Sequence, residues 1–342
     1  MSGKLRILAL VHRHLVPPDP IPDGTDIVAA PWRTEHDVIT TLRALGHDVR
    51  ALGVHDDLGD IRRASEEWKP HIAFNLLEAF DDITIFDQNV VSHLELLKLP
   101  YTGCNPRGLL LARDKSLSKK LLAYHRIRVP EAEVYRIGRP VRRPKRLAFP
   151  LIVKSLTQEA SIGISQASVV DSDERLNERV AFIHQSIGTA AIVEQYIEGR
   201  ELYVGIIGNQ TLQSLPVWEL FFTNMPPEAR RIATDRVKWS VKYQKKYGIE
   251  SGLARDLPEG VSDRIQHVCK RAYRALELSG FARVDLRLDG DGHVWVLEAN
   301  PNPQIAKGED FAASADKIGI GYESLLQRIV NLGIRWQPES VA

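Results

Sequence analysis

The stretch ARVDLRLDGDGHVWVLEANPNP, residues 282–303, decides the fold of this chain. Two runs rich in Val, Leu and Trp flank the turn-forming sequence DGDG, and this pattern predicts a β-hairpin. With a loop of two or four residues, Arg283 lies directly opposite Glu298. Asp285 then lies opposite Val296. A loop one residue longer would divide the polar residues between the two faces of the hairpin.

Side chains alternate between the two faces of a strand, so the predicted pairing gathers the polar side chains on one face. That face carries Arg283, Asp285, Glu298 and Asn300. The apolar face carries Val284, Leu286, Trp295 and Leu297. Carboxylate and amide oxygens suit Mg²⁺ or Mn²⁺, so the polar face is a candidate metal site. Spacing alone leaves open the alternative that this face simply meets water.

Composition limits the classes of protein to be considered. A chain of 342 residues exceeds one ordinary domain, so we expect two or three. The net charge of +1 gives no basis for binding nucleic acid or an anionic membrane, and any anionic ligand must be held locally. The two cysteines, Cys104 and Cys269, form neither a disulfide framework nor a zinc motif. With no signal sequence and no run long enough to span a bilayer, we expect a cytoplasmic protein.

The first hundred residues alternate strands and helices, which predicts a doubly wound parallel sheet. The expected strands are 5–11, 49–54 and 72–77, and the expected helices are 34–45, 61–68 and 88–97. No GxGxxG motif follows the first strand, so a dinucleotide site is poorly supported. We expect the histidines of this part to be surface or core residues and not acid–base groups; they include His12, His14, His71 and His93.

After the first hundred residues, the sequence predicts a strand, a charged segment and an amphipathic helix before the hairpin. Residues 149–154 predict a strand ending at Lys154, before a loop of small residues at 159–163. Residues 232–249 are rich in lysine, and we interpret them as an irregular loop that covers a site or, equally, as a solvated surface. Apolar residues from Val261 to Leu276 predict an amphipathic helix that leads to the hairpin.

Taken together, five segments resemble the ATP-grasp superfamily, and most closely its D-alanine–D-alanine ligase branch. Besides ARVD and LEAN of the hairpin, they are YTGCNPRGLLLARDK, FPLIVKSLTQEASIG, VEQYIEGRELYVGIIGN and RVKWS, in family order. The resemblance implies an α/β (α+β) chain in three parts: an N-terminal domain at 1–112, a central ATP-grasp subdomain at 113–206 and a C-terminal one at 207–335. It also implies that ATP lies between the last two.

The resemblance implies a role for each of several residues. Those expected to contact ATP are Lys115, Lys154, Ser161, Glu194, Gln195, Ile197, Glu201 and Lys238. Among them, the lysines would contact phosphates, and the backbone at 194–197 would form hydrogen bonds with adenine. Glu201 would accept hydrogen bonds from the ribose hydroxyls. Asp285, Glu298 and Asn300 match the metal ligands, which would hold Mg²⁺ or Mn²⁺. Arg283 matches the arginine at the reacting centre, and Glu35 the glutamate near the substrate amino group.

The implied reaction is an ATP-dependent ligation of a carboxylate to an amine through an acyl phosphate, releasing ADP. Its substrates would be small, amino-acid or peptide-like molecules, and dimers are frequent in the family. The chain departs from the ligase branch at residues 301–307, PNPQIAK, at Ala160 and at residues 75–78, NLLE. Prolines cannot donate N–H bonds to a substrate carboxylate, so we predict substrates other than two D-alanines. Authentic D-alanine–D-alanine ligation and a non-catalytic, ATP-binding regulatory protein remain the alternatives.

Overall fold

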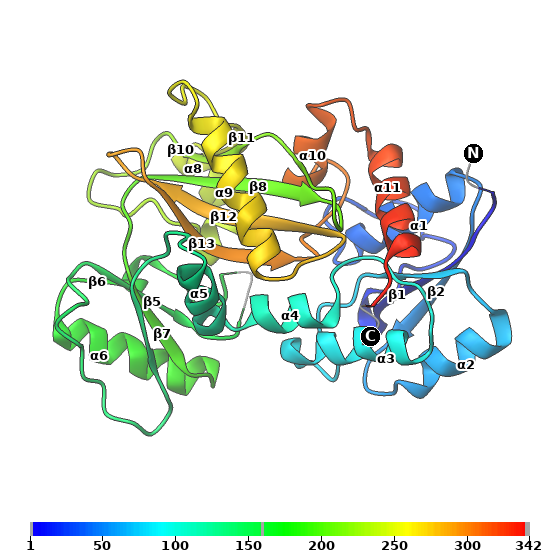
Figure 1. Cartoon of the computed structure of the whole chain (residues 1–342), viewed down its shortest axis with the longest axis horizontal. Coiled ribbons are helices and arrows are strands. Elements are labelled where there is room, and N and C mark those ends of the chain that lie inside the picture. Colours follow the sequence, from blue (N-terminus) through cyan, green and yellow to red (C-terminus); the bar gives the residue numbers. More distant parts are fainter. Residues whose placement is uncertain (1–2, 159–160, 339–342) are drawn as a thin grey trace.

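The computed structural model describes residues 3–158 and 161–338. Its strands form three sheets, which follow one another along the chain and lie in distinct parts of the molecule (Figure 1). No helix within these ranges is both long and apolar enough to cross a membrane.

The N-terminal part contains a parallel sheet, as the alternating pattern predicts. Its order is β2-β1-β3, with β1 at Arg6–His12, β2 at Asp48–Val54 and β3 at Ile72–Asn75. Helix α1 (Arg33–Ala44) covers the face that carries Ile7 and Ala9. Helices α2 (Gly59–Trp68) and α3 (Asp87–Leu96) cover the face of Leu8 and Leu10. Because β1 is buried on both sides, its apolar run is continuous and not alternating.

The central part contains an antiparallel sheet of order β4-β7-β5-β6. The strands are β4 (Ala132–Tyr135), β5 (Leu151–Ser155), β6 (Val169–Val170) and β7 (Ala191–Gln195). Two helices, α4 (Pro106–Arg113) and α5 (Lys115–Tyr124), lead from the N-terminal part to this sheet (Figure 1). The helical segments of the central part itself are η3 (Gln166–Ser168), α6 (Asp173–Phe182) and η4 (Ile183–Ile187). Helix α6 packs Leu176 and Val180 on Leu151 and Val153 of β5. One face of this small sheet is therefore buried by the helix, and the other is available for a ligand.

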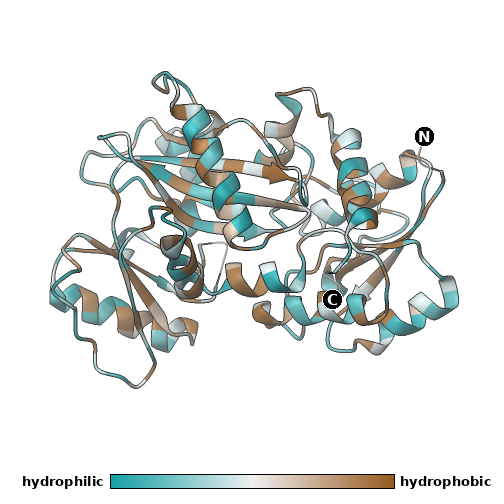
Figure 2. Cartoon of the chain, viewed as in Figure 1, coloured by the Kyte–Doolittle hydropathy of each residue, from teal (hydrophilic) through white to brown (hydrophobic). Residues whose placement is uncertain are grey.

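The C-terminal part contains a larger antiparallel sheet of order β11-β10-β8-β12-β13, with β9 paired to β8. The strands are β8 (Arg200–Ile207), β9 (Gln213–Ser214), β10 (Trp218–Phe222), β11 (Ile249–Leu253), β12 (Phe281–Leu288) and β13 (Val294–Pro301). Helix α9 (Val261–Ala275) packs on one face of this sheet and places Ile265, Cys269 and Ala272 in the core between them. The side of α9 turned to the viewer in Figure 2 is largely hydrophilic, as expected for an amphipathic helix on a sheet.

The last helices return the chain to its beginning. After α10 (Asp310–Asp316), helix α11 (Tyr322–Arg335) packs Leu325 and Ile329 into the core that contains Ile7 of β1. In Figure 1, α11 lies beside α1. The N-terminal sheet is thus held against the C-terminal part by the end of the chain.

The three predicted sequence ranges remain a proposal, and the limit after residue 206 falls inside β8. Strand β8 is hydrogen-bonded to both β10 and β12. We therefore propose that the central part ends before Arg200, which keeps the larger sheet in one unit.

The prediction of an irregular loop at 232–249 is wrong, because this segment contains α7 (Asp235–Trp239) and α8 (Val241–Tyr247). Side-chain caps start both helices: Thr234 accepts from the N–H of Val237, and Ser240 accepts from that of Tyr243. Gly248 ends α8 with a φ of 56°. The caps outweigh the weak apolar periodicity of these short helices.

Candidate active site

The hairpin turn is longer than predicted. Leu288 pairs with Val294, so five residues, 289–293, form the loop. The carboxylate of Asp289 sets this length, since it accepts hydrogen bonds from the N–H groups of Asp291 and His293 and from the Trp295 indole. The predicted pairing of Arg283 with Glu298 and of Asp285 with Val296 is therefore wrong.

A β-bulge restores the arrangement that the longer loop would have destroyed. The register shifts after Asp285, where Leu297 has no partner, and Asp285 then lies opposite Glu298. Arg283 lies opposite Asn300, so the predicted polar face exists with different pairs. The apolar face was predicted less well: Val296 belongs to the core, whereas Leu297 lines the pocket described next. Trp295 is half-buried beneath the guanidinium of Arg128, outside the core cluster.

This polar face forms one wall of a pocket between the central sheet and the larger C-terminal sheet. Its lining contains nine of the predicted site residues: Lys154, Ser161, Glu194, Gln195, Ile197, Glu201, Lys238, Asp285 and Glu298. Among the described residues, the lining does not include Lys115, Arg283, Asn300 or Glu35. The first three contact or neighbour the lining residues, whereas Glu35 lies on α1 of the N-terminal part.

Arg283 is held in place by its neighbours on the sheet. Its Nε and Nη2 donate to the two carboxylate oxygens of Asp285 at 2.7 and 2.8 Å. The guanidinium also lies 4.9 Å from the centre of the Tyr203 ring. Bidentate pairing and cation–π contact fix its direction, so it is preorganised beside the two hairpin carboxylates.

Glu298 is surrounded by cations. Burial would raise the pKa of its carboxyl, but Lys115, Lys154, Lys238 and Arg283 lower that pKa to about 2. The ammonium of Lys115 lies 3.7 Å from Glu298 and donates to the carbonyl of Gln158. Glu298 is therefore ionised at neutral pH and provides the negative charge that a divalent cation requires.

The residues at the end of the hairpin fit a hard divalent cation. Asp285 and Glu298 lie directly opposite each other on neighbouring strands. The Cβ atoms of such a pair are about 4.5–5.5 Å apart, which allows two carboxylates to share one ion. The amide nitrogen of Asn300 is buried without a hydrogen-bond partner, so its carboxamide is not committed to the protein. Two carboxylates and an uncommitted amide form the oxygen-rich ligand set that Mg²⁺ prefers.

A buried lysine that sequence reasoning missed joins the two walls of the pocket. Lys119 of α5 donates to the carbonyl of Leu297 at 2.9 Å and lies 3.3 Å from Glu194. Lys154 contacts the other oxygen of Glu194 at 3.1 Å. The Glu194 side chain is thus neutralised inside the protein, which leaves the backbone of its segment for a ligand. Its helical position four residues after Lys115 could have indicated Lys119.

Arg287 was also missed. Its guanidinium donates to Glu201 at 2.7 Å and to the carbonyl of Ile197 at 2.8 Å. The hydroxyl of Tyr203 donates to the other oxygen of Glu201. Arg287 therefore fixes both the segment expected to read adenine and the carboxylate expected to bind ribose. The period of two that selected Arg283 and Asp285 continues to Arg287 and could have revealed it.

Two further segments cover the pocket. Lys238 lies on α7, whose start is fixed by the Thr234 cap. The hydroxyl of Ser161 donates to the carbonyl of Ala233 at 2.7 Å, so the small-residue loop is attached to the segment that precedes α7. The neighbouring Ala160, at which the chain departs from the ligase branch, lies outside the described residues.

Glu35 is a buried carboxyl with a raised pKa and an unpartnered oxygen. Burial, together with the charge of Glu78, raises its pKa to about 7, and its Oε2 has no hydrogen-bond partner. A buried and unsatisfied carboxyl is costly to the fold, which is typical of residues retained for function.

Two sheets enclose a pocket of lysines and opposed carboxylates, and comparison with known proteins identifies the chain as an ATP-dependent, ADP-forming carbon–nitrogen ligase with the ATP-grasp fold. A family model described as "D-ala D-ala ligase C-terminus" matches residues 126–331. The chain belongs to this D-alanine–D-alanine ligase family.

Relatives and solved structures agree with this assignment. A D-alanine–D-alanine ligase from Desulforudis audaxviator is 30% identical over 315 residues, covering 90% of this chain and 88% of the relative. The structure of the Bacillus anthracis D-alanine–D-alanine ligase complexed with ATP matches with a TM-score of 0.74 at 22% identity, covering 97% and 98% of the two chains. The VanG D-Ala:D-Ser ligase of Enterococcus faecalis gives a TM-score of 0.69 at 18% identity, covering 97% and 100%. The structural matches support the fold.

We predict that Lys119→Met destabilises the protein by about 3 kcal/mol, because it removes one partner of a buried carboxylate and leaves the Leu297 carbonyl unsatisfied. Equilibrium urea unfolding measures this change. Lys120→Met, at the exposed next position of α5, is the matched control and should change the free energy of unfolding little. Equal effects of the two substitutions would contradict the structural role of Lys119.

We predict that Glu35→Gln stabilises the protein above neutral pH. Between pH 4.5 and about 7 the folded state binds more protons at Glu35 than the unfolded state, so stability contributed by this group falls as pH rises. The substitution should therefore raise the free energy of unfolding by up to about 3 kcal/mol at pH 8 and change it little near pH 4. Urea titrations at both values test this. Glu66→Gln, an exposed glutamate of α2, should have little effect at either pH.

Proposed function

We propose that this protein joins the carboxylate of one small molecule to the amine of another through an acyl-phosphate intermediate. The observation that carries the proposal is the pairing of Asp285 with Glu298 in a pocket that also receives Lys154 and Lys238. Opposed carboxylates with nearby ammonium groups are suited to a polyphosphate and its divalent cation.

In this proposal ATP lies between the two sheets. The ammonium groups of Lys115, Lys154 and Lys238 contact its phosphates as point charges. The backbone from Glu194 to Ile197 reads the adenine, and Glu201 accepts from the ribose. Each oxygen of Glu201 already accepts one hydrogen bond, from Tyr203 or from Arg287. Each also retains a lone pair that can accept from a ribose hydroxyl. Mg²⁺ held by Asp285, Glu298 and Asn300 would neutralise phosphate charge.

The chemistry proceeds in two steps. A carboxylate oxygen of the first substrate forms a bond to the γ-phosphorus of ATP, and the bond to the ADP oxygen breaks. The amine nitrogen of the second substrate then attacks the acyl carbon, loses a proton, and displaces inorganic phosphate. Arg283 stabilises the negative charge on the acyl oxygens, and Asp285 keeps its guanidinium aimed at the reacting centre. Glu35 contacts the amino group of a substrate.

The end of the hairpin supports substrates other than two D-alanines. Pro301 and Pro303 have no N–H to offer a substrate carboxylate. Between them, the Asn302 side chain accepts from the N–H of Cys104 at 2.8 Å. Further on, the Lys307 backbone is bound by Asp37 and Arg33 of α1. This segment therefore uses its polar groups to attach to the N-terminal part, and we infer a different acceptor pocket.

Authentic D-alanine–D-alanine ligation is the second candidate, favoured by the activity named for the relatives. The VanG protein, named as a D-Ala:D-Ser ligase, indicates that the second substrate varies among proteins of this fold. The two candidates differ only in the substrate pair and share the ATP site.

We predict that mixed pools of carboxylates and amines release ADP, with a new amide mass, faster than D-alanine alone does. Coupled ADP measurement and mass spectrometry test this. Comparable ADP release and D-alanyl-D-alanine from D-alanine alone would establish the second candidate. Binding of Mg-ATP with no ADP release in any pool would contradict the ligase proposal and favour a regulatory ATP-binding protein.

We predict that Asp285→Asn and Asn300→Ala each reduce ADP formation by at least about 100-fold, because a misplaced cation loses several kcal/mol of charge stabilisation. Asp291→Asn, on the exposed turn of the same hairpin, is the control and should retain the wild-type rate. Circular dichroism checks that the fold is intact. Full activity of the folded Asp285 and Asn300 variants would contradict the assigned metal ligands.

A further inference from the structure

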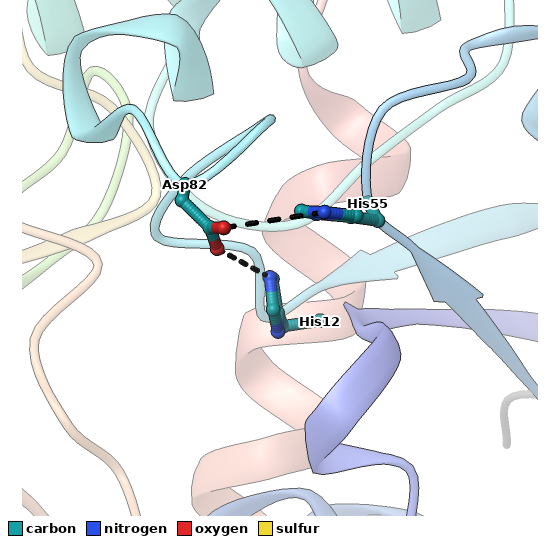
Figure 3. A group of neighbouring side chains, drawn as sticks. All are labelled: His12, His55 and Asp82. Atoms are coloured by element: carbon teal, nitrogen blue, oxygen red, sulfur yellow. Dashed lines mark ion pairs between the residues drawn. The ribbon is translucent and has the colours of Figure 1, made fainter.

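Three side chains meet at the edge of the N-terminal sheet, away from the hairpin (Figure 3). His12 ends β1, His55 follows β2, and Asp82 lies in the segment after β3. In a parallel sheet of order β2-β1-β3, these positions share the carboxyl edge, and the chain leaves β1 and β3 toward opposite faces. The crevice at such a point is where open α/β sheets bind ligands.

The atoms of these side chains are spaced as metal ligands are. His12 Nε2 lies 3.3 Å from one carboxylate oxygen of Asp82, and His55 Nε2 lies 4.0 Å from the other. One ligand atom from each residue falls within 4.8 Å of the other two. Tetrahedral zinc with bonds of about 2.0–2.1 Å places its ligand atoms roughly 3.3 Å apart. The distance between His12 and Asp82 matches that spacing, and the distance between His55 and Asp82 is longer.

The two imidazoles are buried and make few hydrogen bonds. His12 Nε2 is buried beside Asp82 but forms no hydrogen bond, and the second ring nitrogen of His55, Nδ1, is also buried without one. Their side chains are only 18% and 21% exposed, whereas Asp82 is 75% exposed and gives access from solvent. A buried ring nitrogen without a hydrogen bond is unfavourable, and coordination of a cation by His12 Nε2 would remove that cost at His12.

The backbone positions the carboxylate toward the histidines. Asp82 has a φ of 56°, a conformation that aspartate tolerates better than most residues. The preceding residue, Asp81, donates its N–H to the carbonyl of His55 at 2.8 Å. The segment after β3 is thus attached to the end of β2, next to the ring that Asp82 faces.

We propose that His12, His55 and Asp82 bind one divalent transition-metal ion of the zinc class. Imidazole nitrogens favour such ions over Mg²⁺, so this site would differ in metal from the oxygen-rich hairpin. Three protein ligands leave a fourth position for water or an external ligand. The ion would connect the ends of β1 and β2 to the segment that follows β3.

A second group of potential ligands, on the hairpin turn, lacks these properties. Asp289 lies near Asp291 and His293, but its carboxylate already accepts two backbone N–H groups and the Trp295 indole. These hydrogen bonds explain the turn without an ion.

The test uses full-length protein stripped with a chelator and then kept in excess Mg²⁺, which occupies oxygen-rich sites. Zn²⁺ is titrated by calorimetry, and Co²⁺ by the intense visible absorption of its four-coordinate complexes. We expect one Zn²⁺ per chain and a visible Co²⁺ band. In His55→Gln and Asp82→Asn, Zn²⁺ affinity should fall by at least about tenfold and the band should disappear.

His267→Gln, which removes an exposed histidine of α9, is the control and should retain both signals. Because Asp82 is largely exposed, Asp82→Asn should keep the unfolding temperature of the metal-free protein, which separates loss of metal from loss of fold. Wild-type protein without the Co²⁺ band, or variants that bind Zn²⁺ as wild type does, would overturn the proposal. ADP release is measured separately, so either result leaves the ligase proposal untouched.

Discussion

One buried ammonium connects the parts of the candidate active site. Lys119 donates to the carbonyl of Leu297, the residue that the bulge leaves without a partner in β12. The same ammonium pairs with Glu194 on β7 of the other sheet. Burial lowers the pKa of Lys119 below its ordinary value, and the charge of Glu194 opposes this change. One ammonium therefore joins the bulge in β13 to the sheet on the other side of the pocket.

The hairpin illustrates how far sequence reasoning reaches. The DGDG turn and the period of two correctly predict two strands with one polar face. The loop length was not predictable, because it depends on the hydrogen bonds that Asp289 makes to its own turn and to Trp295. The bulge was not predictable either, since the Leu297 carbonyl at the bulge accepts its hydrogen bond from Lys119, 178 residues away. The extra residue in the loop and the extra residue in β13 cancel in parity, so the predicted face survived a wrong register.

The segments expected to bind ATP and those expected to bind substrates also contain features that local patterns predict and features that they do not. Lysines at the ends of strands and helices are indicated by local patterns, whereas Arg287 acts through distant backbone such as the carbonyl of Ile197. In the segment expected to lie near the substrates, the prolines predict that their own backbone cannot donate hydrogen bonds to a substrate carboxylate. They do not predict that Lys307 is held by Asp37 and Arg33, about 270 residues earlier, because non-local pairs leave no periodic signal.

Two carboxyls have opposite electrostatic properties, and this contrast separates the two halves of the proposed site. Four cations lower the pKa of Glu298 to about 2, so its charge is fixed and available to a divalent ion at any physiological pH. Burial and Glu78 raise the pKa of Glu35 to about 7, so its charge at neutral pH depends on what binds beside it. A substrate ammonium near Glu35 would favour the ionised form and bring its own compensation for burial. In the proposed function, the phosphate half is charged before substrates arrive, and the amine half becomes charged when its substrate binds.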